Sequence, residues 1–135
     1  MWIFLNDAFL SIVSDKDNPD NLLVRARHHG DIRRVFPRVE VVITPEADYR
    51  YRACVPRTLV AEKIASQIAE IDYRNFKESV TDENRHIVYF QVWRQMFIWQ
   101  GVMLEKLHPT ASPPTARAGK KPGRKRWSLF GGRAQ

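Results

Sequence analysis

The chemical feature that stands out first in the sequence is two pairs of arginines at alternating positions: Arg25 and Arg27, and Arg50 and Arg52. Alternate side chains of a strand point to one face, so each pair is expected opposite the apolar residues of its strand. Guanidinium groups on an open sheet face can bind the phosphates of nucleic acid, although Tyr49 and Tyr51 are predicted to point the other way. The alternative is a solvated face with an ion pair to Glu40.

The end of the chain carries a second set of cations. Residues 109–135 contain seven Lys and Arg and no acidic residue, and five of these cations lie close together: Lys120, Lys121, Arg124, Lys125 and Arg126. Such a run releases counterions when it neutralises phosphates, which indicates salt-dependent binding to nucleic acid. Trp127 and Phe130 follow directly and are expected to contact a partner's groove. The alternative is a solvated extension without a partner.

A long apolar segment forms the third candidate. It is predicted to be a helix that is capped by Thr81, runs to about Leu107 and is stopped by Pro109. Most of its apolar residues form one core-facing stripe, but four residues lie off the stripe or widen it: Ile87, Phe90, Ile98 and Trp99. A helix that is apolar on more than one side is either central in the fold or at an interface. These four residues, with Trp127 and Phe130, are therefore the candidate protein interface, and a homodimer is one expectation.

Residues that could bind a metal or perform catalysis show no characteristic spacing. The histidines and the cysteine are not paired at metal-ligand distances along the chain: His28, His29, His86, His108 and Cys54. The acidic stretch 15–20 lacks the glycine and the closing glutamate of a calcium loop. The sequence also contains no glycine-rich phosphate loop and no nucleophile motif. It therefore indicates no metal, no cofactor and no catalytic residue.

Periodicity and turn residues place these candidates in a mixed fold. Strands are predicted at Trp2–Leu5, Ala8–Val13, Leu22–His28, Val39–Ile43 and Tyr49–Val55. A short helix or turn is predicted at Gly30–Phe36, and helices are predicted from Pro56 to Ile71, in part of 72–80, and at 81–107. The order β-β-β-α-β-β-α-α predicts an α+β fold, with a single antiparallel sheet and helices on one face. The inner βαββα portion is similar to a ferredoxin-like fold, with an N-terminal hairpin in place of the final strand.

Charge divides the chain into two parts. The net charge of +7 lies in residues 109–135, because the other fifteen Lys and Arg balance the fifteen Asp and Glu. We expect a compact domain at 1–108 and a disordered basic tail at 109–135.

The single cysteine fits a reducing cytoplasm. The longest apolar stretch, Met96–Leu104, is far shorter than the ~20 residues of a membrane span, so no membrane contact is expected.

Several short stretches occur together: Ser11–Val13, Val24–Arg27, Thr44–Pro45 with Asp48–Arg52, Ile71–Lys77 and Val92–Trp93. As a set they resemble a group of short, uncharacterised bacterial proteins, over roughly residues 2–107. That group has no assigned activity, so the resemblance implies a self-contained body and supplies no catalytic residues.

Three functions remain open. The first is a non-enzymatic binding module that contacts nucleic acid or a nucleic-acid-handling protein complex, with electrostatic capture by residues 109–135. The second is a small inhibitor or adaptor, of the kind found on mobile elements, that docks through the last helix. The third is an enzyme of unknown class, for which the four arginines of the sheet are the only candidate polar cluster.

Overall fold

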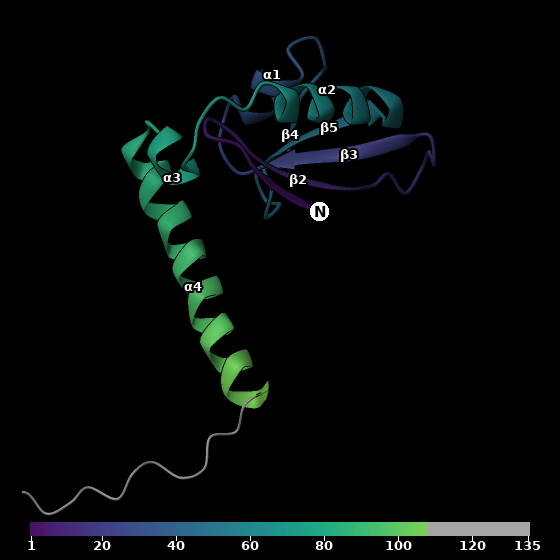
Figure 1. Ribbon diagram of the computed structural model, residues 1–135. Helices are drawn as coiled ribbons and strands as arrows, with labels where there is room; N and C mark the ends of the chain where they lie inside the picture. Colours follow the sequence, from purple (N-terminus) through teal and green to yellow (C-terminus); the bar gives the residue numbers. More distant parts are fainter. Residues whose placement is uncertain (108–135) are drawn as a thin grey trace, which may run out of the picture. The chain divides into compact units, whose positions relative to one another are not determined.

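The computed structural model describes residues 1–107 and confirms the α+β fold (Figure 1). Its elements are β1 (Trp2–Phe4), β2 (Phe9–Ser14), β3 (Asn21–Ala26), α1 (Asp31–Val35), β4 (Val42–Ile43), β5 (Tyr51–Pro56), α2 (Arg57–Ala69), α3 (Phe76–Ser79) and α4 (Glu83–Leu107). The predicted order is confirmed, and the connection expected to be partly helical contains the short helix α3. The predicted tail, 109–135, and His108 lie outside the described residues.

The five strands form one antiparallel sheet in the order β1-β2-β3-β5-β4. The inner part of this order agrees with the predicted ferredoxin-like arrangement, because β5 lies between β3 and β4. Strand β2, from the N-terminal hairpin, takes the place next to β3 that a final strand would occupy. In the β3–β5 register Val24 pairs with Ala53 and Arg25 with Arg52, so apolar and basic side chains fall on opposite faces.

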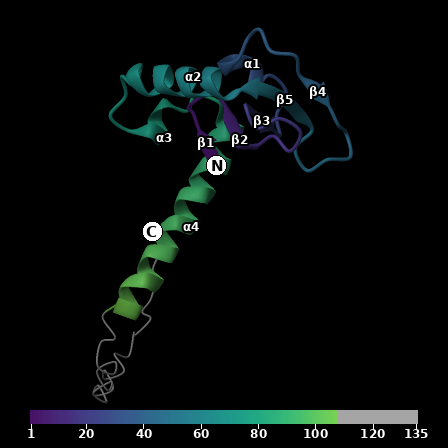
Figure 2. The same cartoon turned by 90° about the vertical axis from the view of Figure 1, so that its right-hand side faces the viewer.

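Helices α1 and α2 cover the apolar face of the sheet, as both views show (Figures 1 and 2). The core beneath them contains Leu10, Val24 and Val55 from three neighbouring strands, and Val60 from α2. Two local features set the starts of these helices. Gly30 adopts a φ of 90° directly before α1, a left-handed conformation that glycine takes without strain. Pro56 precedes α2, where its missing N–H removes no helical hydrogen bond.

The last helix, α4, is 25 residues long, and the boundary between two units of the chain falls within it, after Phe97. The prediction that Thr81 caps this helix is wrong. The side chain of Asp82 accepts the hydrogen bond from the Arg85 N–H instead, at 2.8 Å. No helix within residues 1–107 is long and apolar enough to cross a membrane.

Candidate functional site

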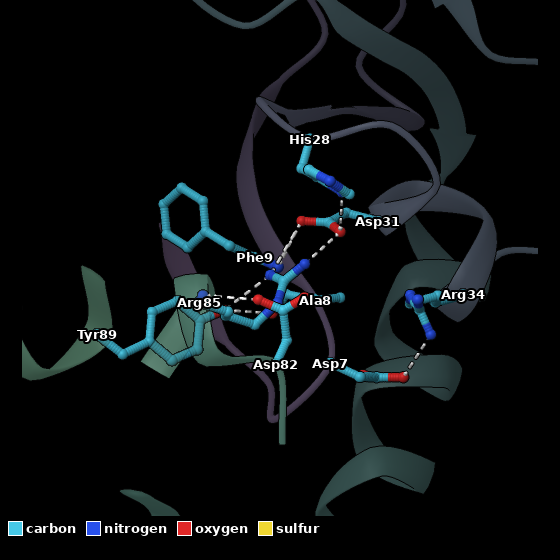
Figure 3. A network of polar contacts seen from close by, with 9 residues as sticks. All are labelled: Asp7, Ala8, Phe9, His28, Asp31, Arg34, Asp82, Arg85 and Tyr89. Carbon is cyan, nitrogen blue, oxygen red and sulfur yellow. Dashed lines mark hydrogen bonds and ion pairs between the residues drawn. The ribbon is translucent and has the colours of Figure 1, made fainter. Parts of the chain in front are cut away.

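A buried carboxylate forms the best-connected polar centre of the described residues. Asp31, in the first turn of α1, is 1% exposed. Its Oδ2 accepts a hydrogen bond from the Phe9 N–H at 3.0 Å. The Arg85 guanidinium donates to Oδ1 at 2.8 Å and to Oδ2 at 3.2 Å. The Nδ1 of the exposed His28 lies 3.5 Å from Oδ1 (Figure 3). Three segments that are far apart in the sequence therefore meet at this carboxylate.

Arg85 connects α4 to the first hairpin through a further hydroxyl. Its Nη1 donates to the Tyr89 hydroxyl at 3.2 Å, and that hydroxyl donates to the carbonyl of Ala8 at 2.9 Å. Burial opposes the positive charge of Arg85, but the hydrogen bonds to Asp31 and Tyr89 outweigh it, so the pKa of the guanidinium lies above its usual value. Burial also raises the pKa of Tyr89, partly offset by Arg85, so the hydroxyl keeps the proton that it donates.

This network has the geometry of a structural anchor. A general base needs a lone pair within reach of a substrate proton. The carboxylate of Asp31 is buried and already accepts hydrogen bonds from the backbone and from Arg85. Removing one partner of a buried ion pair leaves an uncompensated charge, which typically costs about 3–5 kcal/mol. The network therefore fixes the first turns of α4 against the β1–β2 hairpin.

A groove of about 490 Å³ opens beside the anchor. Its apolar wall comes from the first hairpin and from α4: Trp2, Phe4, Phe9, Val88, Tyr89 and Val92. Its polar lining is Arg27, His28, Asp31, Asp82, Asn84 and Arg85. The Phe4 ring centroid lies 4.8 Å from that of Phe9 and 5.0 Å from that of Tyr89, so much of the aromatic wall packs on itself. An apolar wall beside the exposed guanidinium of Arg27 is suited to binding.

Three of the four predicted arginines gather around Tyr49. The guanidinium carbons of Arg25 and Arg27 lie 4.7 and 4.3 Å from the centroid of its ring. The Nε of Arg52 donates to the Tyr49 carbonyl at 3.0 Å, and its Nη2 lies 3.7 Å from the carboxylate of Asp48. The prediction that Tyr49 points to the apolar face is wrong. Strand β5 begins two residues later, so its alternation does not extend back to Tyr49.

Internal contacts hold most of these guanidinium groups. Arg25 donates to the Ser11 hydroxyl and Arg27 to the Asp48 carbonyl, both at 2.8 Å. The Nε of Arg25 is buried without a hydrogen-bond partner among the described residues. Arg50 is exposed and takes part in none of these contacts. The sheet therefore brings three arginines together and leaves Arg27 and Arg50 accessible to a partner.

The predicted interface residues of α4 are all exposed. Their exposed fractions lie between 44% and 57%: Ile87, Phe90, Ile98 and Trp99. Phe90 belongs to a ladder of stacked rings with Trp93 and Phe97, in which successive centroids are 5.6 Å apart. The remaining predicted site residues lie outside the described residues: Lys120, Lys121, Arg124, Lys125, Arg126, Trp127 and Phe130.

The anchor residues Asp31, Arg85 and Tyr89 were not among the site residues predicted from the sequence. One signal was present, because Arg85 lies one turn before Tyr89 on the stripe that continues through Val92 and Met96. A charged residue on an apolar helical stripe indicates a buried partner. Asp31 carries no comparable signal, since its burial depends on residues more than fifty positions away.

Within the described part of the chain, no three His, Cys, Asp or Glu side chains lie close enough together to hold a metal ion. The described geometry thus comprises a buried anchor, a groove, a partly neutralised arginine cluster and an exposed apolar helix.

Comparisons with protein-family models, with curated proteins and with solved structures found no match to this chain.

Proposed function

We propose that the protein is a non-enzymatic binding module whose docking element is α4 and whose partner is another protein chain. An adaptor or an inhibitor would have this arrangement. The anchor at Asp31 and Arg85 fixes the first turns of the helix to the sheet. The helix beyond these turns is then available for docking.

The observation that carries the proposal is a row of six residues along α4, five of them apolar and exposed. The row follows the alternating spacing of three and four residues that places side chains on one side of a helix: Phe90, Trp93, Phe97, Gln100, Leu104 and Leu107. We call these six residues the α4 seam. Its five apolar members are between 44% and 69% exposed. Water-exposed aromatic and leucine side chains in a continuous row are typical of a surface that another chain covers.

The area of this row supports the same conclusion. At about 150–250 Å² per aromatic side chain, the three rings of the seam expose roughly 300 Å² together. With the two leucines and the neighbouring Met96, the patch reaches roughly 600 Å², the upper end of what monomeric proteins expose. Lys77 covers part of one ring, with its Nζ 4.2 Å from the Trp93 centroid, but Trp93 is still 45% exposed.

Site-specific photocrosslinking in living cells tests this docking role. A crosslinking amino acid replaces Phe97 in one variant and Gln95 in the control. Both positions are exposed, and two residues correspond to about 200° around the helix, so they lie on nearly opposite sides. We expect a reproducible adduct with one protein, identified by mass spectrometry, from position 97 alone. Equal adducts from both positions, or none from position 97, would contradict the proposal.

A second candidate function is nucleic-acid binding, either directly or within a nucleic-acid-handling complex. Two observations favour it: the accessible guanidinium groups of Arg27 and Arg50, and the seven unopposed cations of residues 109–135. The single cysteine, Cys54, fits the reducing cytoplasm in which such a complex would form. The side chains of Arg25 and Arg27 are already ordered by stacking on Tyr49. Binding a phosphate would therefore cost them little additional conformational entropy.

Retention on DNA and RNA over a salt series tests this second function. One variant replaces the five clustered cations of residues 120–126 with Gln, and another carries Arg27→Gln and Arg50→Gln. Each phosphate contact adds about 0.9 to the slope of log affinity against log salt on B-DNA. The first variant, with five cations fewer, should therefore lower the slope by about 4.5, and the second, with two fewer, by about 1.8. Unchanged slopes in both variants would exclude the function.

A further inference from the structure

We propose that the α4 seam pairs with a second copy of this chain in an antiparallel helix pair. The inference rests on the proposed function, because it names the occupant of the same surface. It also goes beyond that function, since it predicts a dimer with one defined relative orientation of the two helices.

The spacing of the seam points to a helix as its occupant. Residues 90, 93, 97, 100, 104 and 107 follow the a and d positions of a heptad over more than two repeats. The 18 residues 90–107 span about 27 Å along the helix. The row therefore forms a narrow strip of this length, which fits the side chains of one facing helix. Gln100 is the one polar member of the row, and a facing protein chain tolerates it better than a lipid surface does.

The size of the patch agrees with a dimer of modest stability. Two copies of a surface of roughly 600 Å² bury about 1,200 Å² in total, the lower end of specific protein interfaces. A second copy is present wherever the chain is present and supplies the same surface, as a two-fold axis requires. No like charges oppose this pairing along the seam, because its six members are all uncharged.

An antiparallel arrangement complements the side chains by size. With a two-fold axis between residues 98 and 99, Phe90 faces Leu107 of the second copy, Trp93 faces its Leu104, and Phe97 faces its Gln100. Every ring then meets a smaller side chain. A parallel pair would set each ring against its own copy and the leucines against each other, which fills the space less evenly.

Sedimentation equilibrium of the full chain over a range of concentrations tests the dimer. Phe97→Glu places a charge in the seam, whereas the control Gln95→Glu places the same charge on the opposite side. We expect wild type and control to form a dimer, and the seam variant to raise the dissociation constant at least about tenfold. Circular dichroism verifies that both variants fold, and Phe97→Ala serves as a milder seam variant. A wild-type chain that stays monomeric up to high micromolar concentration would overturn the inference.

Disulfide trapping tests the orientation. In a Cys54→Ser background, a chain with Trp93→Cys is mixed with a chain with Leu104→Cys. We expect the mixed disulfide to dominate, because the two positions face each other only in the antiparallel pair. Dominant 104–104 disulfides would overturn the antiparallel arrangement. The photocrosslinking experiment separates the homodimer from the general docking role of α4. Crosslinks from position 97 to a different protein would contradict the homodimer but support the docking role. The absence of any crosslink would contradict both proposals.

Discussion

At the scale of single residues, the ion pair between Asp31 and Arg85 joins the start of α1 to the start of α4. The two residues are 54 positions apart, and the carboxylate is almost completely buried. A buried charge is tolerated only when a partner compensates for the water that burial removes, and Arg85 makes the shortest ion pair with this carboxylate, at 2.8 Å. His28, at 3.5 Å, is exposed and makes a weaker contact.

We therefore predict that Arg85→Ala destabilises the protein by about 3–5 kcal/mol, since it leaves the Asp31 carboxylate buried and unpaired. Urea denaturation followed by circular dichroism measures the change. The control, Arg94→Ala, removes an exposed arginine of the same helix that forms no ion pair among the described residues, and should stay within about 0.5 kcal/mol of wild type. Equal losses in the two variants would show that Arg85 is not an anchor.

A second residue-scale prediction concerns Cys54. The thiol is exposed, and a hydrogen bond to the Asp15 carboxylate is the main cause that raises its pKa; the negative charge of that carboxylate acts in the same direction. Because the thiolate is the reactive form, Asp15→Asn should lower the thiol pKa and speed alkylation by iodoacetamide at fixed pH. The control is Asp20→Asn in the same connection, which should leave the rate unchanged. A rate unaffected by Asp15→Asn would count against this contact.

At the scale of secondary-structure elements, the start of α4 depends on one capping side chain. Asp82 accepts a hydrogen bond from the Arg85 N–H, whereas Thr81 makes no such contact. Asp82→Ala should therefore cost about 1 kcal/mol of stability and Thr81→Ala much less. Differential scanning calorimetry of the two variants measures the difference. A larger loss from Thr81→Ala would place the start of the helix one residue earlier.

The contact between the end of β3 and the segment before β5 is a second feature at this scale. Tyr49 is buried, and its ring lies beneath the guanidinium groups of Arg25 and Arg27. Tyr49→Phe keeps the ring and should change the unfolding free energy by less than about 1 kcal/mol, whereas Tyr49→Leu removes both cation–π contacts and should cost about 1–3 kcal/mol. Equilibrium urea unfolding compares them, and equal stability of the two variants would contradict a role for the ring.

At the scale of the whole molecule, charge and core are carried by different parts of the sequence. Residues 1–108 contain equal numbers of acidic and basic groups, and the hydrophobic core forms from residues of the sheet, α1 and α2. A chain ending at His108 should therefore unfold within about 2 °C of the full-length chain, because it keeps every core residue that the structure describes within 1–107. Differential scanning calorimetry of both chains makes the comparison. A large drop in the unfolding temperature would assign the basic segment a structural role.

Local pattern was sufficient for much of the fold. The alternation of Leu22, Val24 and Ala26 with Leu23 and Arg25 predicted a strand with one apolar face, and β3 has that face in the core. The order of strands and helices also followed from periodicity, because each period reports which side of an element is buried. Local pattern failed for α4. The expectation that most of its apolar residues form a core-facing stripe is wrong, because Tyr89 is the one buried residue of this helix and Trp93, Phe97, Leu104 and Leu107 are 45–69% exposed.

Tertiary structure decided what depends on distant residues. The burial of Asp31, its pairing with Arg85 and the position of Tyr49 beneath two arginines all join segments that no local pattern connects. The sequence by itself determined the elements, their order and the separation of charge, since each depends on neighbours in the chain. Only the folded chain decided which polar groups are neutralised internally and which remain for a partner, because the energy of a charge depends on the atoms that surround it in space.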